Sequence, residues 1–141
     1  MFNMILLSHK NTFCAIINIY CNRIAKGEEM KICVIGTGYV GLVAGTCLAD
    51  MGNDVICVDN DLEKLKKLHE GIIPIYEPGL EELIKANTAE GRLKFSSDLE
   101  KAVKESLVCF IAVGTPQSED GSADMQYVMN VAESIGKAIN G

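Results

Sequence analysis

Residues 30–42 read MKICVIGTGYVGL, an apolar run followed by three glycines in the spacing G-x-G-x-x-G. The run at 31–35, KICVI, is short and almost entirely apolar, which is typical of a strand buried in a parallel sheet. Small and apolar residues continue without proline to Met51, and Gly52 then stands where a helix commonly ends. This stretch therefore predicts a strand, a tight glycine turn and a helix in direct succession.

The glycine turn, placed between a strand and a helix, predicts a dinucleotide-binding site. Gly36 permits the tight turn, Gly38 leaves no Cβ in the path of a pyrophosphate, and Gly41 lets the helix approach the strand closely. The start of the helix adds free N–H groups and a partial positive charge. We expect the whole segment to bind the cofactor, Tyr39 and Val40 included. The alternative is a glycine-rich turn without a ligand.

An acidic residue follows the second predicted strand, which covers residues 54–58. Asp59 lies 18 residues after Gly41, where its carboxylate can accept hydrogen bonds from the adenosine ribose hydroxyls of a dinucleotide. The same negative charge would repel the 2′-phosphate of NADP. The sequence therefore predicts NAD as the cofactor.

Helical and strand patterns alternate along the rest of the chain. After the second strand, Asp61 is the expected cap of an amphipathic helix that Gly71 ends. The other elements that we expect are helices at 81–87, 98–105 (capped by Ser97 or Asp98) and 124–139, and strands at 92–97 and 107–113. The last helix is expected to bury one apolar face, made of Met125, Val128, Met129, Ala132, Ile135 and Ile139.

This alternation predicts an α/β fold, a Rossmann-type doubly wound parallel sheet in the strand order 3-2-1-4. The fold is expected to be incomplete, because the chain supplies little more than half of such a sheet and later strands are missing. The strand at 107–113 is an unbroken apolar run, which predicts burial on both faces and at both edges. We expect one truncated NAD-binding domain, residues 30–141.

Residues 1–29 read differently, and we expect a leader there that is disordered or not native, with Met30 as the start of the protein. An added N-terminal helix or strand is the alternative. The longest apolar run of this leader is interrupted by Asn18 and is too short to span a membrane, and its order of residues does not fit a secretory signal. We therefore expect a cytoplasmic protein without a membrane partner.

The charge and the cysteines exclude other classes of site. The formal net charge is −6, which argues against a nucleic-acid partner because no basic surface would neutralise phosphates. The chain has six cysteines without a C-x-x-C pair, and only two histidines. We expect no metal site, and we expect the cysteines in apolar segments to be small buried hydrophobic residues: Cys33, Cys47, Cys57 and Cys109.

Three further segments narrow the family: PIYEPGL at 74–80, VGTP at 113–116 and DGSADM at 120–125. Together with the glycine segment they resemble the NAD-binding domain of the UDP-glucose/GDP-mannose dehydrogenase family, over residues 30–141, and DGSADM favours the UDP-glucose type. The resemblance implies that Val40 contacts NAD through its backbone and that Asp59 holds the adenosine ribose. It further implies that Lys64 lies beside the adenine end and that Thr115 lies near the nicotinamide.

The family's reaction oxidises a sugar alcohol to a carboxylate with two NAD, through a cysteine-bound intermediate. The resemblance implies that the nucleophilic cysteine and the substrate pocket lie beyond Gly141, so we expect no catalytic residue in this chain and no activity from the chain alone. The expected partner of the full-length enzyme is a nucleotide sugar, UDP-glucose, and the full-length enzyme is expected to be a homo-oligomer.

Other functions remain open at this point. One alternative is an NAD-binding module or subunit that works with a separate catalytic chain, and another is a dehydrogenase of UDP-N-acetylhexosamines or GDP-mannose. A third is a 6-phosphogluconate or 3-hydroxyacyl-CoA dehydrogenase, but these would not be expected to carry PIYEPGL and VGTP together.

Overall fold

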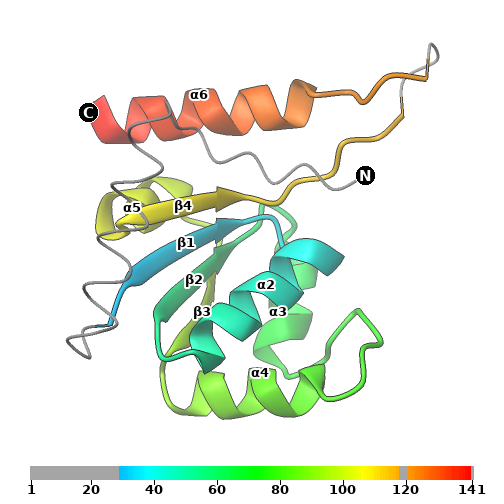
Figure 1. Cartoon of the computed structure of the whole chain (residues 1–141), viewed down its shortest axis with the longest axis vertical. Helices are drawn as coiled ribbons and strands as arrows, with labels where there is room; N and C mark the ends of the chain where they lie inside the picture. Colours follow the sequence, from blue (N-terminus) through cyan, green and yellow to red (C-terminus); the bar gives the residue numbers. More distant parts are fainter. Residues whose placement is uncertain (1–28, 118–120, 141) are drawn as a thin grey trace.

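Four parallel strands form one sheet in the spatial order β3-β2-β1-β4 (Figure 1). The computed structural model describes residues 29–117 and 121–140, so the expected leader lies outside the described residues except for Glu29. The strands are β1 (Lys31–Ile35), β2 (Asp54–Val58), β3 (Leu93–Ser96) and β4 (Val108–Ile111). The predicted α/β fold of Rossmann type and its strand order are thus confirmed.

Five helices in the described part of the chain cover the two faces of the sheet. They are α2 (Tyr39–Asp50), α3 (Leu62–His69), α4 (Leu80–Ala89), α5 (Leu99–Glu105) and α6 (Gln126–Asn140). The helices α2, α3 and α4 pack on one face, and α5 and α6 pack on the other. In Figure 1, α6 lies at the top beside β4, and α4 lies at the bottom. None of these helices is both long and apolar enough to cross a membrane.

The strands are buried on both faces because their side chains alternate between two apolar clusters. In β1, Ile32 and Val34 join the cluster beneath α2, α3 and α4. Cys33 and Ile35 join the second cluster, beneath α5 and α6. This alternation explains why β1 reads as a continuous apolar run, and it fixes which face of the sheet each helix covers.

Local signals in the sequence set several helix ends. Asp61 caps α3 by accepting a hydrogen bond from the Lys64 N–H at 3.0 Å. Asp98, rather than Ser97, caps α5 by accepting from the Lys101 N–H at 3.0 Å. Gly52 has a φ of +91° directly after α2, as expected for a left-handed helix end.

The observed ends of other elements correct the sequence prediction. α4 begins one residue earlier and ends two residues later than predicted. α6 begins at Gln126 rather than at Asp124, because Asp124 lies before the helix and its side chain accepts a hydrogen bond from the Gln126 N–H. β4 is shorter than the predicted 107–113, since its partner β1 ends at Ile35, whose carbonyl accepts a hydrogen bond from the Ala112 N–H.

The outer edge of β4 pairs with no other described strand, and three of its four residues are only half-buried, which agrees with the expectation of an incomplete sheet. Two other predictions of burial were wrong, at least in part. On α6, the prediction was right for Val128, which is buried, and for Ile135, which packs against the second cluster together with Val131. It was wrong for Met129 and Ile139, which are 65% and 69% exposed. Cys47 is exposed rather than buried, since it faces outward from α2.

Candidate functional site

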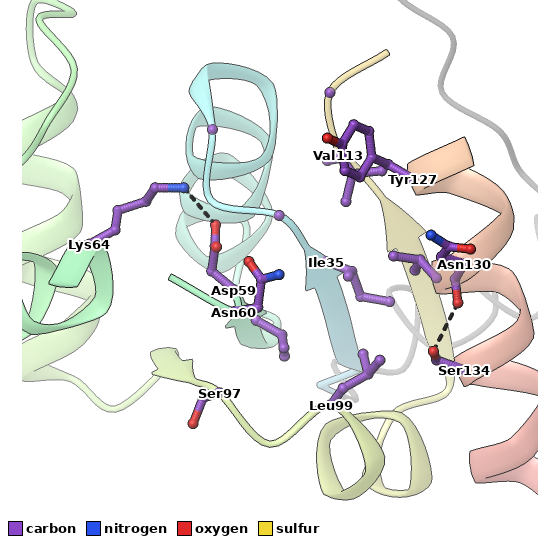
Figure 2. Close-up of a pocket in the computed structure, with 16 residues that line it drawn as sticks. Ile35, Asp59, Asn60, Lys64, Ser97, Leu99, Val113, Tyr127, Asn130 and Ser134 are labelled. Carbon is purple, nitrogen blue, oxygen red and sulfur yellow. Dashed lines mark hydrogen bonds and ion pairs between the residues drawn. The ribbon is translucent and has the colours of Figure 1, made fainter. Parts of the chain in front are cut away.

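A groove with a volume of about 620 Å³ opens at the carboxyl ends of β1, β2 and β4 (Figure 2). It lies beside β1 where the strand order reverses, because the chain adds β2 and β3 on one side of β1 and then β4 on the other. Ligands bind at this point in sheets of this kind. Its walls come from five parts of the chain: the glycine turn, the end of β2 with α3, the start of α5, the end of β4, and α6.

The glycine turn is packed tightly against the end of β4. Gly36 has a φ of +103°, and a Cβ atom there would lie 2.7 Å from the carbonyl oxygen of Ala112. A Cβ atom on Gly41 would lie 1.8 Å from the carbonyl oxygen of Gly36. Both positions therefore require glycine for the turn to fold back on itself.

Gly38 has a different role, because a Cβ atom there would meet no other atom within 4 Å. Gly38 is the N-cap of α2, and no side chain caps that helix. The Leu42 N–H donates the first helical hydrogen bond, to the Gly38 carbonyl. The N–H groups before Leu42 in the first turn therefore have no partners within the helix. Open space next to unpaired N–H groups and a helix dipole is a cradle that fits a pyrophosphate.

Asp59 stands opposite the glycine turn and is nearly buried, with 9% of its surface exposed. Its Oδ2 accepts from the Thr37 N–H at 2.8 Å, from the Thr37 hydroxyl at 2.6 Å and from the Lys64 ammonium at 2.9 Å. Its Oδ1 accepts from the Asp61 N–H at 3.0 Å. The carboxylate therefore joins the glycine turn to the start of α3.

These contacts keep Asp59 ionised. Burial raises the pKa of the carboxyl group, but the hydrogen bonds from Thr37, from the Asp61 N–H and from Lys64 outweigh burial and lower the pKa well below its ordinary value of 3.8. The ammonium of Lys64 also keeps a positive charge at this end of the groove. A negatively charged acceptor at the end of β2 is the group that the sequence predicted for binding a ribose.

The structure brings four of the eight predicted cofactor-binding residues into the groove wall: Gly36, Gly38, Asp59 and Lys64. The other four do not line it. Gly41 is buried behind the turn, and Tyr39 and Val40 begin α2 with exposed side chains. Thr115 is half-buried and follows Gly114, the last residue of the β4 end that lines the groove.

The side chain of Tyr39 instead ties the predicted PIYEPGL loop to the glycine turn. Its hydroxyl donates to the carboxylate of Glu77, which raises the pKa of the Tyr39 hydroxyl. Residues 72–79 form no helix or strand, as expected from Pro74 and Pro78. The contact places this loop beside the start of α2.

One wall of the groove, provided by α6, was not predicted from the sequence. This wall consists of Tyr127, Asn130, Val131 and Ser134. In Figure 2, Tyr127, Asn130 and Ser134 lie on the opposite side of the groove from Lys64. Their spacing is that of one helical face, so a polar stripe beside the apolar face of the last helix was a signal that could have indicated them. Thr37 was also missed, because it occupies a variable position of the glycine motif.

The three cysteines of the strands lie in the core of the sheet, away from the groove. Cys109 packs against the second cluster, and a hydrogen bond with Cys33 lowers the pKa of its thiol. Burial raises the pKa of Cys57 to about 12. A hydrogen bond with Cys109, and burial after it, raise the pKa of Cys33. Thiols that stay protonated are poor nucleophiles, and both side chains belong to the core of the sheet rather than to the groove.

Comparisons with known proteins agree with this geometry. The family model described as the UDP-glucose/GDP-mannose dehydrogenase family, NAD binding domain, matches residues 30–141. UDP-glucose 6-dehydrogenase TuaD of Bacillus subtilis is 52% identical over 111 residues, which cover 79% of this chain and 24% of that protein. The chain thus spans about a quarter of the length of the curated relatives that it matches.

Solved structures of dehydrogenases share the fold. A ternary complex of GDP-mannose dehydrogenase from Pseudomonas aeruginosa matches with a TM-score of 0.75 and 44% identity, over 78% of this chain and 25% of that one. The UDP-N-acetyl-mannosamine dehydrogenase Cap5O from Staphylococcus aureus matches with a TM-score of 0.70 and 38% identity, over 76% and 25%. The similarity therefore extends to relatives whose names give three different nucleotide sugars.

Proposed function

This chain belongs to the UDP-glucose/GDP-mannose dehydrogenase family, and from that premise we propose that it is the NAD-binding portion of a UDP-glucose 6-dehydrogenase. Such an enzyme oxidises UDP-glucose to UDP-glucuronate and reduces two NAD. The observation that carries the proposal is the groove itself, in which an open glycine turn faces an ionised carboxylate at the end of β2.

The groove suits NAD in two respects. The open space at Gly38 and the unpaired N–H groups of α2 would hold the pyrophosphate, and Asp59 would accept a hydrogen bond from the adenosine ribose. When bound, NAD supplies the acceptor for a hydride. Thr115 follows the end of β4 and is our candidate for the nicotinamide side, while Val40 is a candidate for contact through its backbone.

The choice of UDP-glucose rests on the 52% identity to an enzyme with that name and on the DGSADM segment. Dehydrogenases of GDP-mannose and of UDP-N-acetylhexosamines remain alternatives, since relatives with those names are 44% and 38% identical. Homo-oligomerisation of the full-length enzyme and a cytoplasmic location remain predictions from the sequence.

The test uses the native protein, captured from its source cells with an antibody against residues 60–80. We expect a polypeptide far heavier than 15.3 kDa that forms NADH with UDP-glucose and forms much less with GDP-mannose or UDP-N-acetylmannosamine. Preference for one of the other sugars would replace UDP-glucose in the proposal. The 141-residue chain alone is expected to form no NADH from UDP-glucose, because Cys33, Cys57 and Cys109 lie in the core of the sheet and not in the groove.

A second candidate is an NAD-binding module that works with a separate catalytic chain. The observation in its favour is the outer edge of β4, which no described strand covers. Native protein of about 15 kDa that binds NADH, and that co-purifies with a second chain needed for sugar oxidation, would support this candidate over the first.

A further inference from the structure

Thr37 lies between the first two glycines of the turn, and it is completely buried. A buried hydroxyl needs a hydrogen-bond partner, and Thr37 has one 22 positions later in the chain. Its hydroxyl and its N–H both donate to Oδ2 of Asp59, at 2.6 Å and 2.8 Å. The side chain of Thr37 thus joins the pyrophosphate side of the groove to the ribose side without lining the groove itself.

The donors around Asp59 are divided unequally between its two oxygens. A carboxylate can accept about four hydrogen bonds, two at each oxygen. Oδ2 already receives three donors, two from Thr37 and one from Lys64, whereas Oδ1 receives only the Asp61 N–H at 3.0 Å. Spare acceptor capacity is therefore found on Oδ1.

We propose that Thr37 is a positioning residue, whose hydroxyl holds the Asp59 carboxylate so that Oδ1 is left to accept an adenosine ribose hydroxyl. This inference rests on the proposed NAD-binding function. Lys64 cannot replace Thr37 in this role, because its side chain is 30% exposed and its ammonium is carried by a flexible stem. The hydroxyl of Thr37 is fixed by the turn and by complete burial.

A fixed carboxylate would also sharpen the choice between cofactors. NAD offers a ribose hydroxyl that Oδ1 can accept, whereas NADP carries a phosphate at the 2′ position that an anion repels. If the Asp59 carboxylate rotated freely, Oδ1 would point at the ribose hydroxyl for less of the time. The protein would then lose more affinity for NAD than for NADP. The ratio of the two affinities therefore reports on Thr37 separately from the stability of the fold.

The experiment measures dissociation constants of NADH and NADPH by cofactor fluorescence, with the 141-residue chain and three variants. Thr37→Val removes the hydroxyl and keeps the shape, and we expect it to weaken NADH binding about tenfold while NADPH changes less than about threefold. Thr37→Ser restores the hydroxyl and should stay within about threefold of the unmodified chain for both cofactors.

Thr46→Val is the matched control. Thr46 is also completely buried, and its hydroxyl donates to the Leu42 carbonyl inside α2 at 2.7 Å, away from the groove. This variant loses a buried threonine hydroxyl of the same kind, and its cofactor affinities should stay within about twofold. Melting temperatures of all variants separate loss of binding from loss of folding.

The proposal is overturned if Thr37→Val binds NADH as tightly as the unmodified chain, or if it loses NADH and NADPH affinity in equal proportion. Should Thr37→Val not fold, the hydroxyl proton of Thr37 in the unmodified chain can be observed by NMR. We expect a slowly exchanging resonance that shifts when NADH binds, and rapid exchange with solvent would overturn the proposal. An unmodified chain that folds but binds no NADH would refute the proposed function itself.

Discussion

The Cα of Gly41 lies so close to the Gly36 carbonyl that a Cβ atom on Gly41 would stand 1.8 Å from that oxygen. The Gly36 carbonyl oxygen is a backbone atom, and Gly36 belongs to the glycine turn that lines the proposed ligand groove. Gly38 lies between these two residues in the chain, yet a Cβ atom on Gly38 would meet nothing within 4 Å. The three glycines of one motif therefore serve two separate purposes, which substitution can distinguish.

Gly41→Ala is expected to destabilise the fold without regard to any ligand. The added methyl group has to displace the turn backbone, which places the loss in free energy of unfolding near the upper end of the overpacking range, about 3 kcal/mol. Urea denaturation followed by circular dichroism measures it. Gly136→Ala on α6 is the control, since a Cβ atom there meets nothing within 4 Å and should raise helix stability by about 0.5–1 kcal/mol. Equal stability of the two variants would contradict the prediction.

Gly38→Ala is expected to keep the fold and lose the ligand. The backbone of Gly38 has φ −70° and ψ −172°, which alanine adopts freely, so the melting temperature should stay within about 2 °C. The new methyl group would stand where we place the pyrophosphate, and NADH affinity should fall at least about tenfold. Fluorescence titration with NADH is the measurement. Unchanged affinity in a folded variant would place the pyrophosphate elsewhere.

The chain is expected to bind NADH at least about tenfold more tightly than NADPH. A 2′-phosphate at about 4 Å from the Asp59 carboxylate would meet roughly 1 kcal/mol of repulsion in water and about 4 kcal/mol at an effective dielectric constant of 20, for each unit of charge. In Asp59→Asn the repulsion disappears and Lys64 remains, so the preference should fall or reverse. Competition titrations with both cofactors test this, and equal dissociation constants in the unmodified chain would refute the role of Asp59.

The fold could be predicted from the sequence because each strand and several helix ends are marked by residues within the element itself. β1 and β2 are short apolar runs between polar ends, and Asp61, Asp98 and Gly52 mark helix ends through local hydrogen bonds or backbone geometry. Burial at the outer edge of the sheet was not predictable in this way. The apolar sequence of β4 predicts a neighbouring strand on each side. Only the three-dimensional structure shows that β1 is its one neighbour among the described strands.

Half of the candidate site could be predicted, and the division has a physical reason. The glycine turn and Asp59 are found from spacing along the chain, because one strand and one helix fix their separation. Asn130 and Ser134 reach the groove only because α6 packs beside β4, and no local pattern gives that distance. Thr37 was missed for another reason, since its importance lies in a partner 22 residues away.

The sequence predicted that Met129 and Ile135 are both buried on α6, but only Ile135 packs against the second cluster, so the two positions should respond differently to substitution. Met129→Gln should change the free energy of unfolding of this chain by less than about 0.5 kcal/mol, because the side chain is 65% exposed. Ile135→Ala removes a half-buried side chain from the second cluster and should destabilise the chain by roughly 1–2 kcal/mol. Urea denaturation compares the two, and a larger loss for Met129→Gln would mean that Met129 is buried, as the sequence predicted.

Acid should remove the stabilisation that Asp59 provides. The pKa of Asp59 in the folded chain lies well below its ordinary value of 3.8, so its contribution is fully present above that value and is lost as pH falls towards the folded pKa. Asp59→Asn carries no such charge and is expected to be less stable near neutral pH, since its amide oxygen can accept on only one side and its NH2 group would face a donor on the other, the Asp61 N–H or those of Thr37 and Lys64. The difference in unfolding free energy between the two proteins should therefore shrink by about 1 kcal/mol between about pH 5 and about pH 3. Urea midpoints at each pH give this difference, and a difference that stays constant over the window would mean that Asp59 is not held in its ionised form by Thr37 and Lys64.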